Sequence, residues 1–421
     1  MIGRPPLRAL LAASLVLALG GCSARASAPA LHVAGNHFAD SLGRETRVFP
    51  AHIGTAEYTC VHPIYDPSRS GGVFALPTTS AVLTAARTWR FNAVRLSLNE
   101  QCWLGVNPVI RGGAPRFGIT PLRGTAARRE GARLRTRYRA AVGGVVARAH
   151  RAGLAVIFDL HWSAAGDAIA WAQWPLPDRQ YSIPFWRSIA RTFRTDRAVM
   201  FELFNEPVRV PAAVLSWRCL RNGCRVPNAC ADCVPAADDT NTRGCGARCP
   251  TREAPRGSYR TAGTQALVDT IRATGARQPI VVPGRFYDND LGRWLAYRPR
   301  DRLGQIAATF HVYSNLPCAD EACWTREVAP VAARVPVIST EFGGINTGQT
   351  EPCAAIAAFD ERFMAWADAH GVSYGAYRWA ADFPHFPRPQ CSYDLLASWD
   401  GTPRYGQGQA IHDHLARVAP G

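Results

Sequence analysis

Eight short apolar runs, most of them separated by a segment of helical character, constrain the fold of this chain most. Almost every position in these runs is apolar, which is typical of strands buried on both faces. Strands that alternate with helices form a parallel sheet. The eight runs cover residues 47–53, 93–98, 155–160, 199–204, 279–282, 307–312, 335–340 and 373–379.

Eight such strands can close into a barrel or form an open doubly wound sheet. No glycine-rich phosphate-binding loop of either common type follows an early strand, which favours the barrel. We therefore predict an α/β protein, a (β/α)8 TIM barrel, and a single catalytic domain over residues 31–421. Upstream of the first run, residues 33–36 and 41–44 predict a small hairpin that plugs the bottom of the barrel.

The first 21 residues have the features of an export signal. Arg4 and Arg8 give the N-terminus a positive charge, an apolar run covers residues 10–19, and the small residues Gly20 and Gly21 follow it. The run is too short for a permanent membrane span. Residues 19–22 resemble the bacterial lipoprotein box, so we expect a lipid anchor on Cys22, a linker over 22–30 and a location on the extracytoplasmic side of a membrane. An ordinary secretory peptide is the alternative.

Cysteine usage agrees with export. Removing Cys22 from the 13 cysteines leaves 12, an even number that can pair fully in an oxidising compartment. The segment 216–257, directly after the fourth run, holds six of them, at positions 219, 224, 230, 233, 245 and 249. Four of these have zinc-ligand spacing, but the export signal favours disulfides. Cys318 should pair with Cys323, and we assign Cys60 to Cys102 and Cys353 to Cys391, although spacing does not determine connectivity.

The net charge of +16 would ordinarily indicate a nucleic-acid partner. Here all of the basic residues are arginine, and they are spread along the chain instead of forming a block. A biased, GC-rich coding sequence explains this pattern about as well as any function does, and an exported protein rarely meets nucleic acid. We expect no nucleic-acid partner.

Polar residues collect where the predicted strands end. In a (β/α)8 barrel the carboxyl ends of the strands form one rim, which carries the reactive groups. Two glutamates, Glu206 and Glu341, end the fourth and seventh strands. Such a pair can cleave a glycosidic bond, because one carboxylic acid protonates the leaving oxygen while the other carboxylate attacks the anomeric carbon. Salt bridges to rim arginines are the structural alternative for either glutamate alone.

The chain resembles glycoside hydrolase family 5, the cellulase family of clan A, over nearly all of its mature length. That family's active site presents Arg, His, Asn-Glu, His-x-Tyr, Glu and Trp in this order. The matching residues are Arg95, His161, Asn205, Glu206, His311, Tyr313, Glu341 and Trp379.

The resemblance implies a role for each of these positions. Glu206 would be the acid/base and Glu341 the nucleophile, which Arg95 and Tyr313 would orient. Asn205 would bind the sugar 2-hydroxyl, His161 and His311 would fix substrate hydroxyls and the acid, and Trp379 would form the floor beneath the sugar. The first strand departs from the family's Gly-Val-Asn pattern, which affects the outer substrate sites.

We therefore expect a retaining β-glycoside hydrolase that acts on a β-linked oligo- or polysaccharide, endo-β-1,4-glucanase activity being the default. Mannanase, β-1,3-glucanase and β-glucosidase activities are alternatives within the family. A glycan-binding surface lipoprotein without catalysis is the alternative from another class. The mechanism requires no cofactor and no metal, and we expect a monomer. The cysteine-rich segment should form a disulfide-stapled flap over one end of the cleft.

Overall fold

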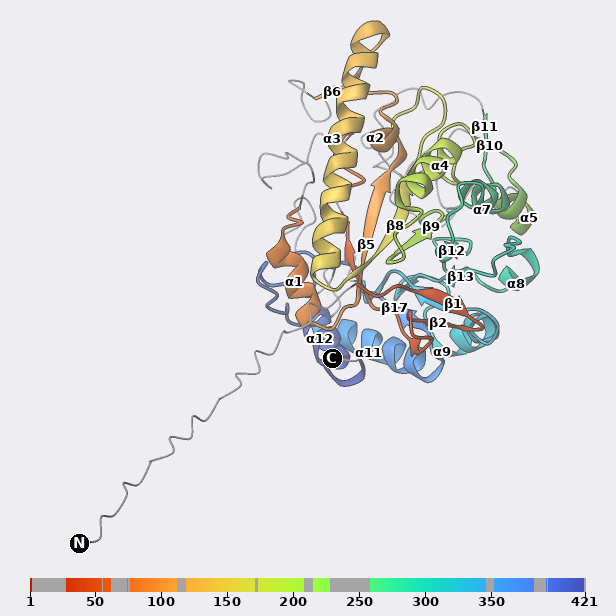
Figure 1. The fold of residues 1–421 in the computed structure, drawn as a ribbon. Helices are drawn as coiled ribbons and strands as arrows, with labels where there is room; N and C mark the ends of the chain where they lie inside the picture. The colour runs from red at the N-terminus through yellow and green to blue at the C-terminus, as the bar shows by residue number, and fades with distance from the viewer. Residues whose placement is uncertain are drawn as a thin grey trace.

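The computed structural model describes residue 1 and residues 28–54, 56–61, 74, 76–111, 119–170, 173–207, 215–227, 258–345, 352–381, 391 and 393–419. Its centre is a parallel sheet in the order β17-β15-β13-β12-β9-β8-β5-β4 (Figure 1). The strands are β4 (Pro50–Ile53), β5 (Ala93–Asn99), β8 (Ala155–Trp162), β9 (Val199–Glu202), β12 (Ile280–Val282), β13 (Ile306–Thr309), β15 (Val337–Ser339) and β17 (Ser373–Tyr374). Each of the eight predicted runs contains or overlaps one of them.

The two end strands, β4 and β17, meet and nearly close the sheet into a barrel. The hydroxyl of Ser373 accepts a hydrogen bond of 3.0 Å from the amide of Val48. At the next inward position, a Cβ on Gly375 would lie 2.2 Å from the carbonyl oxygen of Pro50, so this approach requires glycine. The predicted (β/α)8 fold class is confirmed.

Helices follow the strands and cover the outside of the barrel (Figure 1). The connecting helices are α1 (Ser80–Thr88), α3 (Gly124–Arg151), α4 (Ser182–Phe193), α7 (Thr264–Arg272), α8 (Trp294–Tyr297), α9 (Glu321–Cys323) with η3 (Trp324–Val328) and α10 (Ala329–Ala332), α11 (Cys353–Ala369) and α12 (Gln407–Val418). Shorter elements decorate the loops: α2 (Glu100–Leu104), α5 (Trp217–Asn222), β6 (Val109–Arg111), β7 (Ile119–Pro121), β10 (Arg225–Pro227), β11 (Ser258–Arg260), β14 (Val312–Tyr313) and β16 (Phe342–Gly343).

The N-terminal segment closes the bottom of the barrel, as predicted. It is an antiparallel sheet of β1 (His32–Ala34), β2 (His37–Ala39) and β3 (Glu45–Thr46). Val33 and Phe38 of this sheet share one buried apolar cluster with residues from inside the barrel, among them Ile157, Met200 and Ile338. The cluster fills the lower barrel, so polar groups inside the barrel lie above it, toward the carboxyl ends of the strands.

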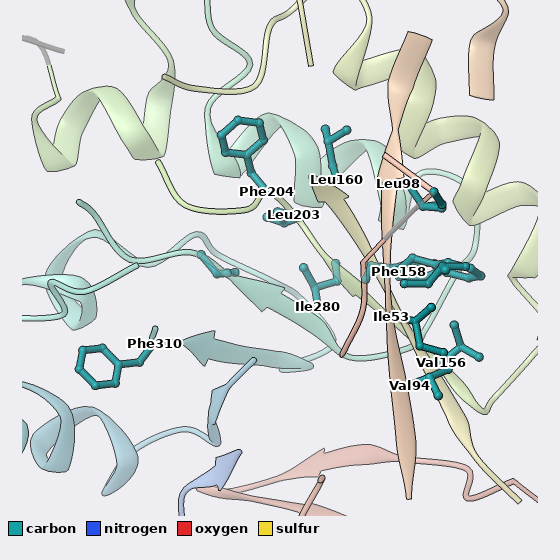
Figure 2. Packing of buried hydrophobic residues seen from close by; sticks show 14 of the residues in the cluster. Ile53, Val94, Leu98, Val156, Phe158, Leu160, Leu203, Phe204, Ile280 and Phe310 are labelled. Carbon is teal, nitrogen blue, oxygen red and sulfur yellow. The ribbon is translucent and has the colours of Figure 1, made fainter. Parts of the chain in front are cut away.

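Alternation along the strands separates core from site. The outward side chains pack between the barrel and the helices, and Figure 2 shows several of them, including Val94, Leu98, Val156, Phe158 and Leu160. The intervening positions point into the barrel, because successive side chains of a strand face opposite sides. On β5 these include Arg95, and on β8 they include Asp159 and His161. All three belong to a polar network described below.

Three predicted disulfides are present: Cys60–Cys102, Cys318–Cys323 and Cys353–Cys391. A fourth joins Cys219 to Cys224 at the start of the cysteine-rich segment. Within that segment β10 pairs with β11, the strand that directly follows the segment. The other four cysteines of the segment lie outside the described residues, so the proposed flap stays a prediction.

The predicted signal sequence, Cys22 and most of the linker also lie outside the described residues. No helix in the part of the chain that the structure describes is both long and apolar enough to cross a membrane.

Candidate active site

Arg95 is the centre of a buried network inside the upper barrel. Its guanidinium donates to both carboxylate oxygens of Glu202 at 2.7 and 2.9 Å, and to Oε1 of Glu341 at 2.5 Å. It also donates to Oδ1 of Asn205 at 2.8 Å and lies 3.1 Å from Asp159. A planar guanidinium carries five fixed N–H donors, so one fully buried side chain orients four partners from three strands and the residues that follow them.

Glu341 is held by a second donor. The Tyr313 hydroxyl donates to its Oε2 at 2.7 Å. The two residues are neighbours because the short strands β14 and β16 pair in parallel and place Val312 beside Phe342. Each Glu341 oxygen therefore accepts a hydrogen bond, which stabilises and aims an ionised carboxylate.

His311 determines where the proton on Glu206 lies. Thr340 donates its hydroxyl hydrogen to Glu202 at 2.7 Å, so its oxygen must accept from Nε2 of His311, 2.9 Å away. The other ring nitrogen, Nδ1, lies 2.9 Å from Oε1 of Glu206. Burial lowers the pKa of His311 to about 4, so the ring is neutral and Nδ1 carries no hydrogen. Glu206 therefore carries the proton and donates a hydrogen bond to Nδ1.

The environment of Glu206 agrees with this assignment. Its side chain is 14% exposed, and burial raises its pKa to about 7 despite the nearby His161 and Arg95. The residue follows β9 with a left-handed backbone, φ +48°, and its amide donates to Asp288 at 2.9 Å. A carboxylic acid that is half-protonated near neutral pH is suited to general acid catalysis.

Glu206 and Glu341 face each other. One carboxylate oxygen of Glu206 lies within 4.8 Å of one of Glu341, and Nδ1 of His311 lies 4.0 Å from Glu341. The two carboxyl groups thus stand on either side of a gap that admits one reacting bond, with the protonated member held by histidine and the other by Arg95 and Tyr313.

His161 and His52 complete the wall of the site. Nδ1 of His161 lies 2.6 Å from Asp159, whose carboxylate also faces Arg95. His52, at the end of β4, accepts a hydrogen bond of 3.1 Å from Arg95 at Nδ1, since arginine can only donate. Its Nε2 must then donate to Ser97, 3.1 Å away, and the ring is neutral. His52 thus helps to hold the arginine that holds Glu341.

The placement of Trp379 corrects the prediction. Its ring is 2% exposed and packs edge-on against Trp89 and Phe91, while its Nε1 donates to the carbonyl of Val82 in α1. It therefore lies in the apolar layer outside the barrel and cannot form a floor for the substrate. The physical reason is that β17 ends at Tyr374, five residues earlier, so strand alternation does not carry on to this ring.

Tyr377 is the aromatic residue that faces the site instead. Its half-buried ring lies edge-on to His52, with centroids 4.8 Å apart, and 6.4 Å from the ring of Tyr313. Its hydroxyl accepts from Arg378 at 3.2 Å. The inward positions of this segment are Ser373 and Gly375. Counting on in steps of two gives Tyr377 and then Trp379, so alternation alone did not separate the two rings.

The remaining predicted residues gather as expected, and the structure adds others. Arg95, His161, Asn205, Glu206, His311, Tyr313 and Glu341 lie in one connected set. Sequence reasoning missed Glu202, Asp159, His52, Thr340 and Asp288. For Asp159, two residues before His161, and for Glu202, two residues after the inward Met200, inward alternation was the available signal.

Two overlapping sets of described side chains could offer ligand atoms to a cation: Glu202, Asp288 and His311, and Glu206, His311 and Glu341. They share His311, whose two ring nitrogens already bind Glu206 and Thr340. A metal ion at either set would have to displace one of these hydrogen bonds.

Comparisons with known proteins identify the family of the chain. Residues 68–382 match the family model for cellulase, glycosyl hydrolase family 5. No curated protein matches the chain significantly.

Solved structures share the fold at low identity. A beta-glucanase from Saccharophagus degradans is 18% identical, with a TM-score of 0.57 over 93% of this chain and 94% of that one. Endoglucanase Cel5A from Thermobifida fusca is 16% identical, with a TM-score of 0.55 over 92% and 97%. A triple mutant of an endo-beta-1,4-glucanase from Xanthomonas axonopodis pv. citri is 17% identical, with a TM-score of 0.53 over 89% and 100%. Because the family model spans most of the chain, this protein is a glycosidase that belongs to glycosyl hydrolase family 5.

Proposed function

We propose that the protein is a retaining endo-β-1,4-glucanase. The observation that carries the retaining mechanism is the approach of Glu206 and Glu341, with carboxylate oxygens within 4.8 Å. Retaining glycosidases separate their two carboxyl groups by about 5 to 5.5 Å, whereas inverting enzymes leave about 6.5 to 9.5 Å for a water molecule.

The first step uses both carboxyl groups. Glu206 donates its proton to the departing glycosidic oxygen, while Glu341 attacks the anomeric carbon and forms a glycosyl ester. Arg95 and Tyr313 hold Glu341 in its ionised form and point it at that carbon. In the second step the ionised Glu206 removes a proton from water, which attacks the same carbon and releases Glu341.

Other residues bind the sugar at the cleavage point. The carbonyl oxygen of Asn205 is occupied by Arg95, so its amide NH2 is the group that can donate to the 2-hydroxyl. Neutral His161, fixed by Asp159, is placed to contact a substrate hydroxyl. The ring of Tyr377 replaces Trp379 as the floor of this subsite, because an aromatic face matches the C–H face of a pyranose.

The family and the solved structures support β-1,4-glucan as the substrate. The Saccharophagus degradans beta-glucanase and the Thermobifida fusca endoglucanase were both solved with cellotetraose. Mannan, β-1,3-glucan and short β-glucosides are the competing substrates.

We also propose that the enzyme is exported and held to the outer side of a membrane by a lipid on Cys22. The four described disulfides support an oxidising compartment. Metabolic labelling with a fatty-acid analogue tests this, because Cys22→Ser should abolish labelling and release the protein from membranes.

The experiment that tests the activity is a screen on β-1,4-glucan, β-1,3-glucan, mannan and their oligosaccharides, with the anomer of the first product followed by NMR. We expect cello-oligosaccharides with a retained β-anomer. Glu341→Ala should abolish hydrolysis while cellotetraose binding persists. An α-anomer as first product would contradict the retaining mechanism, and hydrolysis of mannan alone would contradict the proposed substrate.

A further inference from the structure

The loop after β12 makes a tight turn with an unusual backbone. φ is +49° at Phe286, +60° at Tyr287 and +57° at Asp288, three consecutive residues in the left-handed region. This conformation is unfavourable for residues other than glycine and persists where surrounding contacts enforce it. At the base of the turn, Arg285 and Asp290 exchange two main-chain hydrogen bonds of 3.1 Å.

This turn binds the main chain on both sides of the catalytic acid. The Asp288 carboxyl accepts the amide of Glu206 at 2.9 Å. The amide of Tyr287 donates to the carbonyl of Pro207 at 3.1 Å. Glu206 itself has a left-handed backbone, so the bond to Asp288 stabilises the conformation that turns its side chain toward His311.

The same turn also binds His311, the histidine that accepts a hydrogen bond from Glu206. The main-chain carbonyl of Asp288 accepts the amide of His311 at 3.0 Å, and the side-chain amide of Asn289 donates to the carbonyl of His311 at 2.8 Å. Both partners of the Glu206–His311 hydrogen bond are therefore attached to consecutive residues of one turn.

Asp288 contributes a buried hydrogen-bond acceptor. The side chain is fully buried, and Oδ1 makes no hydrogen bond among the described residues. Burial raises the pKa of Asp288 well above its ordinary value. The buried Asp288 carboxyl orients the main chain of the acid through its hydrogen bond from the Glu206 amide.

We propose that Asp288 is a positioning residue that sets the geometry of proton donation by Glu206. This inference rests on the proposed function, since it assigns Glu206 as the general acid. If Asp288 positions Glu206, its loss should lower kcat/KM more for a leaving group that needs a proton than for one that does not. A general loss of structure would lower kcat/KM equally for both leaving groups.

The test compares two aryl β-cellobiosides, one with the phenyl and one with the 2,4-dinitrophenyl leaving group, on the wild type, Asp288→Ala and Asp288→Asn. Dinitrophenolate leaves without protonation, whereas phenolate needs it. For Asp288→Ala we expect kcat/KM on the phenyl glycoside to fall about 10- to 100-fold, and that on the dinitrophenyl glycoside to stay within about threefold. Asp288→Asn keeps an acceptor oxygen, so both rates should stay within about threefold.

Asp360 provides a matched control. It is also a fully buried carboxyl that accepts a main-chain amide, that of Gly344 at 2.8 Å, and its Oδ2 makes no hydrogen bond among the described residues. Asp360→Ala should lower thermal stability, and any loss of rate should be equal for the two glycosides.

Two results would overturn the inference: equal losses on both glycosides for Asp288→Ala, or full activity of that variant on the phenyl glycoside. A wild-type enzyme that cleaves neither glycoside would overturn the proposed function, and this inference with it.

Discussion

Nδ1 of His311 and Oε1 of Glu206 lie 2.9 Å apart, and the hydrogen-bond chain from Glu202 through Thr340 places the proton on Glu206. Glu206 is active as an acid only while protonated, and burial raises its pKa to about 7. We therefore predict that kcat/KM falls about tenfold per pH unit above a pH of about 7. Initial rates on cello-oligosaccharides across pH 4 to 9 check this.

Glu206→Gln is the control for the assignment of that alkaline limb. Glutamine does not titrate, and the first step on a dinitrophenyl glycoside needs no acid, so kcat/KM of the variant on this substrate should show no alkaline limb. Persistence of the limb in this variant would assign it to another group.

Thr340→Val should move the same limb. Valine matches threonine in shape but cannot accept from Nε2 of His311. The neutral ring is then free to carry its hydrogen on Nδ1 and donate to ionised Glu206, which stabilises the charged form. We expect the alkaline limb to shift to lower pH, measured as above. An unchanged limb would show that Thr340 does not determine the histidine tautomer.

Substitution of Trp379 should mainly lower stability, whereas substitution of Tyr377 should mainly lower activity. Trp379→Ala removes a ring from the apolar layer against Trp89 and should lower the free energy of unfolding by about 3 to 5 kcal/mol. Tyr377→Ala removes the proposed floor and should lower kcat/KM by about tenfold to a hundredfold, with a smaller loss of stability. Urea unfolding and steady-state kinetics on the purified variants decide this, and the opposite pattern would restore Trp379 as the floor.

The sequence predicts the barrel strands and most of the site residues. Apolar runs located every barrel strand, because strands buried on both faces leave an unbroken apolar signal. Strand ends then placed Glu206 and Glu341 on one rim. The prediction for Trp379 was wrong because β17 is only two residues long and the chain leaves the sheet before it reaches Trp379. Asp288 could not be predicted, because it acts by a contact between two loops that no periodicity records.

Arg95 should be essential for stability as well as activity. Arg95→Met would leave Glu202, Asp159 and Glu341 buried or nearly so without their shared cation, and breaking such a site costs about 3 to 5 kcal/mol. Burial already raises the pKa of Asp159 to about 7 with Arg95 present. Acids with raised folded-state pKa values favour folding at low pH, so the loss should be greater at pH 8 than at pH 5.

Chemical denaturation of Arg95→Met and of the wild type at pH 5 and pH 8 checks whether the loss of stability is greater at the higher pH. Arg133→Met is the control, because its pairing with Glu130 lies on the solvent-exposed face of α3. The control should change stability by less than about 1 kcal/mol at either pH. Equal losses for Arg95→Met at both pH values would argue that lost packing, not unpaired charge, is the cause.

The disulfides should differ in how much each contributes to the free energy of unfolding, according to the length of the loop that each closes. Cys60–Cys102 spans 42 residues and Cys318–Cys323 spans 5. Constraint of the unfolded chain predicts a contribution of about 4 kcal/mol for the former and about 2 kcal/mol for the latter. All four cysteines are buried, so replacing each pair by alanine leaves similar cavities and isolates the loop term. Urea unfolding of the two double variants measures the difference, and equal destabilisation would show that local packing, not chain entropy, determines what these bonds contribute.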